Sequence, residues 1–158
     1  MQQLPHSRSC YVCGESNPLG LQLRFETDGR IVHARFTPRA EHNGFKGIVH
    51  GGIIATALDE ILSWVCAIHA QRFAFCAELN VRYLNPMPTG GEVHLRAELV
   101  ADRKGRLFEA RAAAQDGGGK IFAEATGKYI PLKNVNVAEL ESDLIGTLPW
   151  AQSAKPGA

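Results

Sequence analysis

Apolar residues recur at helical spacing in the middle of the chain. From about Gly52 to about Ala67 they fall three or four positions apart, which is the period of one face of a helix. The members of this pattern are Ile53, Ile54, Ala57, Leu58, Ile61, Leu62 and Val65. The spacing predicts one long helix that is largely buried.

On both sides of this helix, apolar and polar residues alternate, which is typical of strands with one buried face. The alternating runs before and after it are residues 21–25, 32–36, 79–83, 93–99, 108–114 and a final strand around Lys120 to Pro131. Short turn sequences rich in glycine, proline and aspartate separate several of these runs. Because short connections favour antiparallel neighbours, we expect an α+β fold in which a curved antiparallel sheet wraps around the central helix.

The central helix carries two adjacent carboxylates, Asp59 and Glu60. At about 100° per residue, Glu60 shares a stripe with Thr56 and Ser63, so we expect it to be a solvated or hydrogen-bonded surface group. Asp59 instead lies on a stripe that is otherwise apolar, where an ionised group is costly unless it is paired or useful. Asp59 is therefore the candidate catalytic residue, and a hydrogen-bonded structural carboxylate is the alternative.

A glycine pair, Gly51 and Gly52, precedes the apolar part of the helix. Small residues let the free N–H groups of a helix start approach a ligand, and the helix dipole favours negative charge there. Gly51 and Asp59 are about 12 Å apart along a helix, so they cannot both touch one reacting carbon within one chain. Two such helices packed antiparallel across a two-fold axis would form two equivalent composite sites.

The run His50-Gly51-Gly52, followed by Asp59, resembles the signature of the hotdog-fold acyl-CoA and phenylacetyl-CoA thioesterases. That family has a His-Gly-Gly run and an acidic residue nine positions after the histidine. The similarity covers roughly residues 10–132, including a strand that ends in proline at 78–86 and an opening Cys-x-x-Cys-Gly. The resemblance implies a hotdog fold and, with the two-chain geometry above, a homodimer; whether two dimers pair further into a homotetramer stays open.

The resemblance also implies hydrolysis of an acyl-CoA thioester to the free acid and CoA. The Gly51 N–H would polarise the carbonyl and hold the developing oxyanion. Asp59 of the second subunit would activate water or attack the carbonyl directly, and the sequence leaves both routes open. Two other functions stay open as well. One is a hydratase or dehydratase of the same fold acting on enoyl or hydroxyacyl thioesters, and the other is a non-catalytic acyl-CoA-binding protein.

Further site residues follow from the same resemblance. His50 is expected to orient the loop or to hydrogen-bond near the carbonyl, with a purely structural histidine as the alternative. Asn43 would help to place water or the thioester, although it lies one position farther upstream than the family pattern has it. Gly52 and Cys76 are expected to contact substrate. Cys76 stands where related thioesterases often carry serine or threonine, and plain packing is its alternative.

The phosphates of CoA would need cations. Arg82, Lys104 and Arg106 are the candidate CoA-binding residues, Lys46 and Arg103 are further candidates, and ordinary solvated charges are the alternative. Coenzyme A is part of the substrate, so no metal or redox cofactor is implied. The identity of the acyl group does not follow from the sequence, because the pocket walls come from several strands and a partner chain.

Overall charge adds little beyond this picture. The formal net charge is +1, which gives no general attraction to nucleic acid or to an anionic membrane. The opening residues have no apolar core of the signal-peptide type, and two carboxylates interrupt the central helix. We therefore expect a cytoplasmic protein whose partners are an acyl-CoA substrate and a second copy of itself.

We expect three parts along the chain: an N-terminal segment (1–18), a hotdog thioesterase domain (19–132) and a C-terminal tail (133–158) with a short helix near Val137 to Leu144. The N-terminal segment contains Cys10 and Cys13, which have the spacing of half a zinc site. No second pair follows, and the residues that could complete a site are His6, His42, Cys66 and Cys76. We therefore expect reduced structural thiols and no metal.

Overall fold

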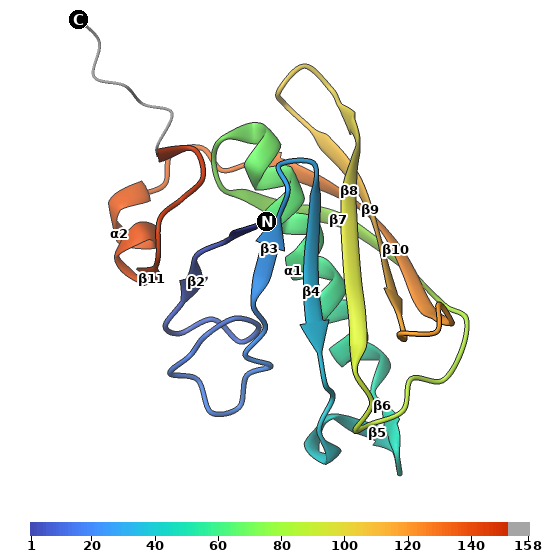
Figure 1. Ribbon diagram of the computed structural model, residues 1–158. Coiled ribbons are helices and arrows are strands. Elements are labelled where there is room, and N and C mark those ends of the chain that lie inside the picture. Colours follow the sequence, from blue (N-terminus) through green and yellow to red (C-terminus); the bar gives the residue numbers. More distant parts are fainter. Residues whose placement is uncertain (152–158) are drawn as a thin grey trace, which may run out of the picture.

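The computed structural model describes residues 1–151 and folds them as one curved sheet around one long helix (Figure 1). Helix α1 (Gly51–Ala70) extends the predicted helix by one residue at its start and three at its end. It ends at Gln71, which adopts a left-handed conformation (φ 53°) and donates its N–H to the carbonyls of Ala67 and Ile68. Its apolar residues form the centre of the core, as the helical spacing predicts.

The sheet has seven antiparallel strands in the order β1-β3-β4-β8-β9-β10-β7. These strands are β1 (Gln2–Gln3), β3 (Phe25–Thr27), β4 (Ile31–Phe36), β7 (Ala74–Tyr83), β8 (Val93–Asp102), β9 (Phe108–Gln115) and β10 (Ile121–Pro131). Helix α1 packs against β4, β7, β8, β9 and β10. Within the described chain β7 pairs with β10 alone, so β7 is an edge strand of ten residues.

The predicted strand at 21–25 is wrong for most of its length, because β3 begins only at Phe25. Leu21 and Leu23 are buried as the alternation requires, but their N–H groups bond to the carbonyls of Tyr11 and Val12. The alternation there comes from packing against the N-terminal segment and not from the sheet.

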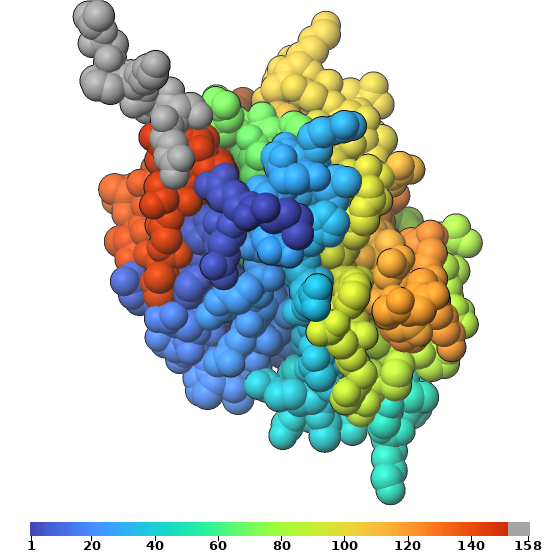
Figure 2. All heavy atoms as spheres, viewed as in Figure 1, coloured from blue at the N-terminus to red at the C-terminus, as the bar shows by residue number. Residues whose placement is uncertain are grey.

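Smaller elements lie outside the main sheet. The turn η1 (Ala40–His42) leads into a short hairpin of β5 (Asn43–Phe45) and β6 (Ile48–Val49), which ends next to the start of α1. The predicted helix in the tail is confirmed as α2 (Val137–Ser142). Strand β11 (Leu144–Ile145) then pairs with β2 (His6–Ser7), so the two terminal segments lie side by side (Figure 2).

The division at residues 18 and 132 stays a prediction, and residues 152–158 of the tail lie outside the described residues. The part of the tail that is described folds back onto the body of the protein. There Leu148 is buried and the Trp150 ring meets the Phe73 ring edge to face, with centroids 5.5 Å apart.

Helix α1 is long and apolar enough to cross a bilayer by length and composition alone. Half of that apolar window is buried inside the fold, however, and the helix packs against five strands. A core helix of a folded domain meets the same criterion, so the helix is explained by its packing.

Candidate active site

The start of α1 leaves one backbone N–H free. His50 caps the helix, and its Nδ1 accepts the Gly52 N–H at 2.9 Å. The next N–H groups, of Ile53 and Ile54, bond to the His50 carbonyl. Within residues 1–151 the Gly51 N–H has no hydrogen-bond partner, and it carries the partial positive charge of the helix end. His50 thus caps the helix start, and the role that the resemblance implies for it near the substrate carbonyl stays a prediction.

A cleft of about 610 Å³ opens at this helix start. Its wall is mainly apolar and comes from the β5–β6 hairpin, the first turn of α1, and the end of β7 with the loop that follows. The lining residues are Gly44, Phe45, Ile48, Val49, His50, Gly51, Ile54, Tyr83, Leu84, Asn85, Pro86 and Met87. Tyr83 fixes one side of the opening by donating its hydroxyl to the Gly51 carbonyl at 2.8 Å. A Cβ on Gly51 would lie 3.3 Å from this ring, so the glycine allows the close contact.

Asp59 lies in the middle of α1, half-buried, and does not line this cleft. The Tyr129 hydroxyl donates to Asp59 Oδ1 at 2.7 Å and also approaches the Asp59 carbonyl at 3.1 Å. Burial, and then the hydrogen bond to Asp59, raise the pKa of Tyr129, so the hydroxyl keeps its proton and acts as the donor. The structure therefore gives Asp59 a fixed carboxylate orientation on the concave side of the sheet.

The local sequence of β10 explains how Tyr129 reaches the helix. A register shift between Lys128 and Tyr129 in the pairing with β7 changes the direction of the strand there. Gly127 leaves room for the ring, because a Cβ at that position would lie 2.5 Å from Tyr129 Cε2.

Cys76, on the neighbouring strand β7, pairs with Tyr129 across the sheet and lies close to Asp59. Burial, and then the Asp59 carboxylate, raise the pKa of this thiol. Cys76 thus stays a neutral thiol beside Asp59. Cys66 lies deeper in the core, where burial raises its pKa to about 12.

The remaining candidates are not gathered at this cleft within one chain. Asn43 is exposed on β5 and does not line it. Arg82 lines a separate hollow on the outer face of the sheet, beside Arg96 and Arg111. Lys104 and Arg106 are exposed in the β8–β9 turn, at the end of the sheet opposite the β5–β6 hairpin (Figure 1). Their roles in CoA binding stay predictions.

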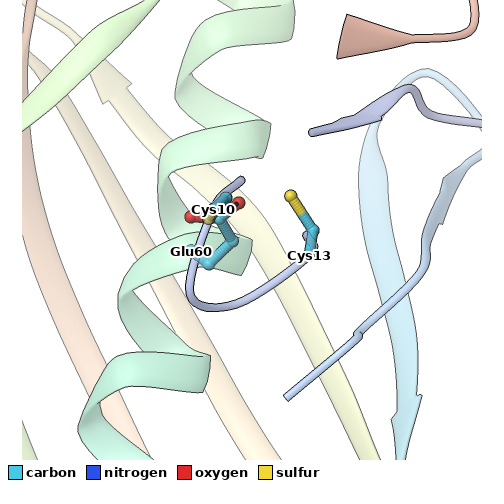
Figure 3. Close-up of side chains that lie close together, drawn as sticks. All are labelled: Cys10, Cys13 and Glu60. Carbon is cyan, nitrogen blue, oxygen red and sulfur yellow. Dashed lines mark hydrogen bonds between the residues drawn. The ribbon is translucent and has the colours of Figure 1, made fainter. Parts of the chain in front are cut away.

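Of the two expectations for Glu60, the hydrogen-bonded group is confirmed and the solvated one is wrong, because Glu60 is half-buried and accepts from the Cys10 thiol at 3.8 Å. The N-terminal segment covers that face of α1 and brings Cys10 and Cys13 to Glu60 (Figure 3). The helical wheel placed Glu60 correctly on a polar stripe, but a wheel does not show what lies over a stripe. Burial raises the pKa of Glu60 to about 7.

Sequence reasoning missed Tyr83 and Tyr129. Both are tyrosines in strand patterns, where an aromatic residue is ordinarily a packing residue. The one available signal was Gly127, since a glycine inside a strand often marks a close approach.

Comparison with known proteins finds similarity to thioesterases, in agreement with the resemblance seen in the sequence. The family model described as "Thioesterase superfamily" matches residues 46–121, which include the start of α1 and Asp59. Mouse acyl-coenzyme A thioesterase THEM4 is 33% identical over 89 residues, or 56% of this chain and 38% of that one. The putative esterase SSO1253 of Saccharolobus solfataricus is 29% identical over 91 residues, or 57% of this chain and 59% of that one. The match thus spans less than two thirds of either relative.

A solved structure supports the fold. The crystal structure of the thioesterase superfamily protein RHA08564 aligns with a TM-score of 0.71 and 26% identity, covering 78% of this chain and 63% of that one. The predicted α+β class and the hotdog arrangement of sheet and helix are therefore confirmed.

Proposed function

We propose that this chain, whose residues 46–121 match the family model of the thioesterase superfamily, hydrolyses an acyl-CoA thioester to a free acid and CoA. The observation that carries the proposal is the free Gly51 N–H at a helix start that opens into a mainly apolar cleft. Such a donor stabilises negative charge on a carbonyl oxygen, and the apolar wall suits an acyl group. Relatives named as acyl-coenzyme A thioesterases support the substrate class.

The reaction needs few groups. Water adds to the thioester carbonyl carbon as Asp59 takes its proton, and the oxygen of the tetrahedral intermediate accepts the Gly51 N–H. The C–S bond then breaks, and CoA leaves as a thiolate, which needs little acid assistance. In the second route the Asp59 carboxylate attacks first, and water cleaves the resulting anhydride. Neither route requires a metal or a redox cofactor at Asp59.

The two routes differ in where solvent oxygen ends up. After several turnovers in ¹⁸O-water, the anhydride route puts ¹⁸O into the Asp59 carboxylate wherever water attacks the aspartyl carbon. The water route leaves Asp59 unlabelled. Mass spectrometry of the peptide that contains Asp59 measures this directly.

We further propose that the site is shared by two chains. Gly51 and Asp59 are about 12 Å apart along α1, and Asp59 does not line the cleft of its own chain. The long edge strand β7 offers unpaired backbone groups, and Phe75 and Tyr83 on it are 48% and 54% exposed. A second copy paired antiparallel on β7 would extend the sheet and set the two α1 helices antiparallel.

Strand β7 also connects both halves of the proposed site. Its Tyr83 end bonds to Gly51, and its Cys76 end lies beside Asp59. Antiparallel pairing centred between Leu79 and Asn80 would put the Tyr83 end of one strand opposite the Cys76 end of the other. That arrangement would bring the Asp59 region of one chain toward the cleft of the other.

The test is release of the free CoA thiol from a panel of short, medium, long and aromatic acyl-CoAs. We expect wild type to hydrolyse at least one of them, and Asp59→Asn, purified in the same way, to be much slower. Binding without thiol release across the whole panel would identify a non-catalytic acyl-CoA binder. Hydration of an enoyl-CoA with its thioester intact would identify a hydratase.

A further inference from the structure

Two cysteines from the N-terminal segment and one carboxylate from α1 meet on the side of the helix that the sheet does not cover (Figure 3). The Sγ atoms of Cys10 and Cys13 and a carboxylate oxygen of Glu60 all lie within 4.8 Å of one another. Cys13 is buried, and the other two residues are half-buried. This cluster has no part in the proposed hydrolysis.

The loop that carries the two thiols is closed tightly. Gly14 donates its N–H to the Cys10 carbonyl at 2.9 Å, and a Cβ on Gly14 would lie 2.2 Å from that oxygen. The turn therefore requires glycine. It sets both sulfur atoms on the side that faces α1.

Backbone N–H groups point at both sulfur atoms. Val12 donates to Cys10 Sγ at 3.2 Å, and Ser7 donates to Cys13 Sγ at 3.4 Å. N–H donors stabilise a thiolate more than a thiol, because the thiolate carries the full negative charge.

Glu60 adds a further negative group. Its carboxylate lies 3.8 Å from Cys10 Sγ, and it forms no ion pair with a basic side chain within residues 1–151. A cluster that gathers thiolate and carboxylate charge in a half-buried place is stabilised most by a cation.

We propose that Cys10, Cys13 and Glu60 bind a zinc ion, with water at the fourth position. Zn–S bonds of about 2.3 Å and a Zn–O bond of about 2.1 Å in a tetrahedron give ligand–ligand edges of about 3.6–3.8 Å. The 3.8 Å between Cys10 Sγ and Glu60 fits such an edge, and a small closure brings the other pairs to it. Two thiolates favour zinc over magnesium or calcium.

This proposal replaces the expectation of plain structural thiols. The third ligand comes from Glu60, a residue 47 positions beyond Cys13 that no metal-binding spacing in the sequence connects to the pair. Bound zinc would tie the N-terminal segment to α1 next to Asp59. The inference does not depend on the thioesterase proposal, because its test measures metal and not turnover.

The test begins with protein reduced and stripped of metal by a chelator, whose free thiols are counted before use. Cobalt(II) is then added as a spectroscopic substitute for zinc. We expect one equivalent to give thiolate-to-cobalt charge transfer and the strong visible bands of tetrahedral coordination, and one zinc to displace it. An absence of thiolate bands, or binding that never saturates at one equivalent, would overturn the proposal.

Variants assign the ligands. Loss of partners in the outer shell of a metal site already costs about 10–100-fold in affinity. We therefore expect Cys10→Ser to weaken zinc binding by more than about 100-fold and Glu60→Gln to weaken it by about 10–100-fold. The matched controls are Cys66→Ala, which removes a thiol elsewhere on α1, and Glu15→Gln, which removes an exposed carboxylate from the same segment.

The controls should bind zinc as wild type does. Equal binding by wild type, Cys10→Ser and Glu60→Gln would overturn the assignment. Loss of binding in Cys66→Ala alone would overturn it as well. Circular dichroism of each metal-free variant separates a lost ligand from a lost fold, and Glu60→Gln, which keeps both thiols, tests the site even where a cysteine variant does not fold.

Discussion

Asp59 and Glu60 are neighbours on one helix, yet their surroundings differ in kind. Asp59 faces the sheet, where a hydroxyl from Tyr129 holds it, and Glu60 faces the N-terminal segment, where it meets two thiols. A hydroxyl donor leaves a carboxylate free to accept a proton from water, whereas thiols and a carboxylate together form a ligand set. Under the two proposals, one turn of helix would serve two separate chemistries, one on each side.

Substitution of each carboxylate by its amide should separate the two roles. Asp59→Asn is expected to lower turnover by roughly 10²- to 10⁴-fold, the usual scale for removal of a general base. Glu60→Gln should cost much less, because its side chain points away from the sheet. Steady-state kinetics on the best acyl-CoA substrate measures both. Equal losses would show that the distinction between the two faces is wrong.

The second prediction tests whether Asp59 of one chain acts on substrate that is bound in the cleft of another chain. Gly51→Pro removes the free N–H, and the backbone can accept proline there because His50 before it is extended (φ −61°, ψ 134°), although its Cβ would press on the Tyr83 ring at 3.3 Å. Gly51→Pro and Asp59→Asn should each be inactive. In dimers mixed from the two, one site has both groups intact and the other has both lesions.

With random assortment half of the dimers are mixed, so activity should return to about a quarter of wild type. The control is each variant refolded alone, which should stay inactive. If the chains exchange, as a mass-labelled sample would show, and no activity returns, the site lies within one subunit.

Tyr129→Phe tests what holds Asp59. The change removes a 2.7 Å hydrogen bond to the carboxylate while keeping the buried ring. A hydrogen bond to a charged group contributes about 1.5–3 kcal/mol, so a loss of roughly 10- to 100-fold in kcat with little change in KM is expected. In the Asp59→Asn background the same change should cost little more. Full additivity of the two losses would mean that Tyr129 does not act through Asp59.

The sequence alone was enough to predict the helix and the strands in which apolar residues recur at one regular spacing. Helix α1 and strands β7 to β10 obey that rule, because each buries one face against the same core. The run 21–25 does not obey this rule for most of its length. Its buried leucines pack against a loop of the N-terminal segment, and alternation alone does not show whether the partner is a loop or a strand. The start of the helix was also predictable, because a cap and a free N–H are local features.

The contacts between distant segments could not be predicted in the same way. Tyr129 reaches Asp59 through a strand irregularity, and Glu60 meets the cysteines because the N-terminal segment crosses α1. Both contacts depend on tertiary packing, which cannot be predicted from the spacing of residues along the chain. The position of Arg82 on the outer face of the sheet could not be predicted either, because a single arginine in the sequence does not indicate which hollow of the surface it will line.

The last prediction has the smallest expected effect on turnover and concerns the Glu60 face alone. Zinc at about 100 times its dissociation constant should stabilise the folded state by about 2.7 kcal/mol. For a chain of this size that corresponds to a rise of roughly 5–10 °C in Tm. Calorimetry of metal-stripped protein with and without zinc measures the shift. Asp59→Asn should keep this rise and Glu60→Gln should lose about half of it or more, because of these two carboxylates Glu60 alone is a proposed ligand. A rise that Asp59→Asn loses and Glu60→Gln keeps would place the metal on the other face of the helix.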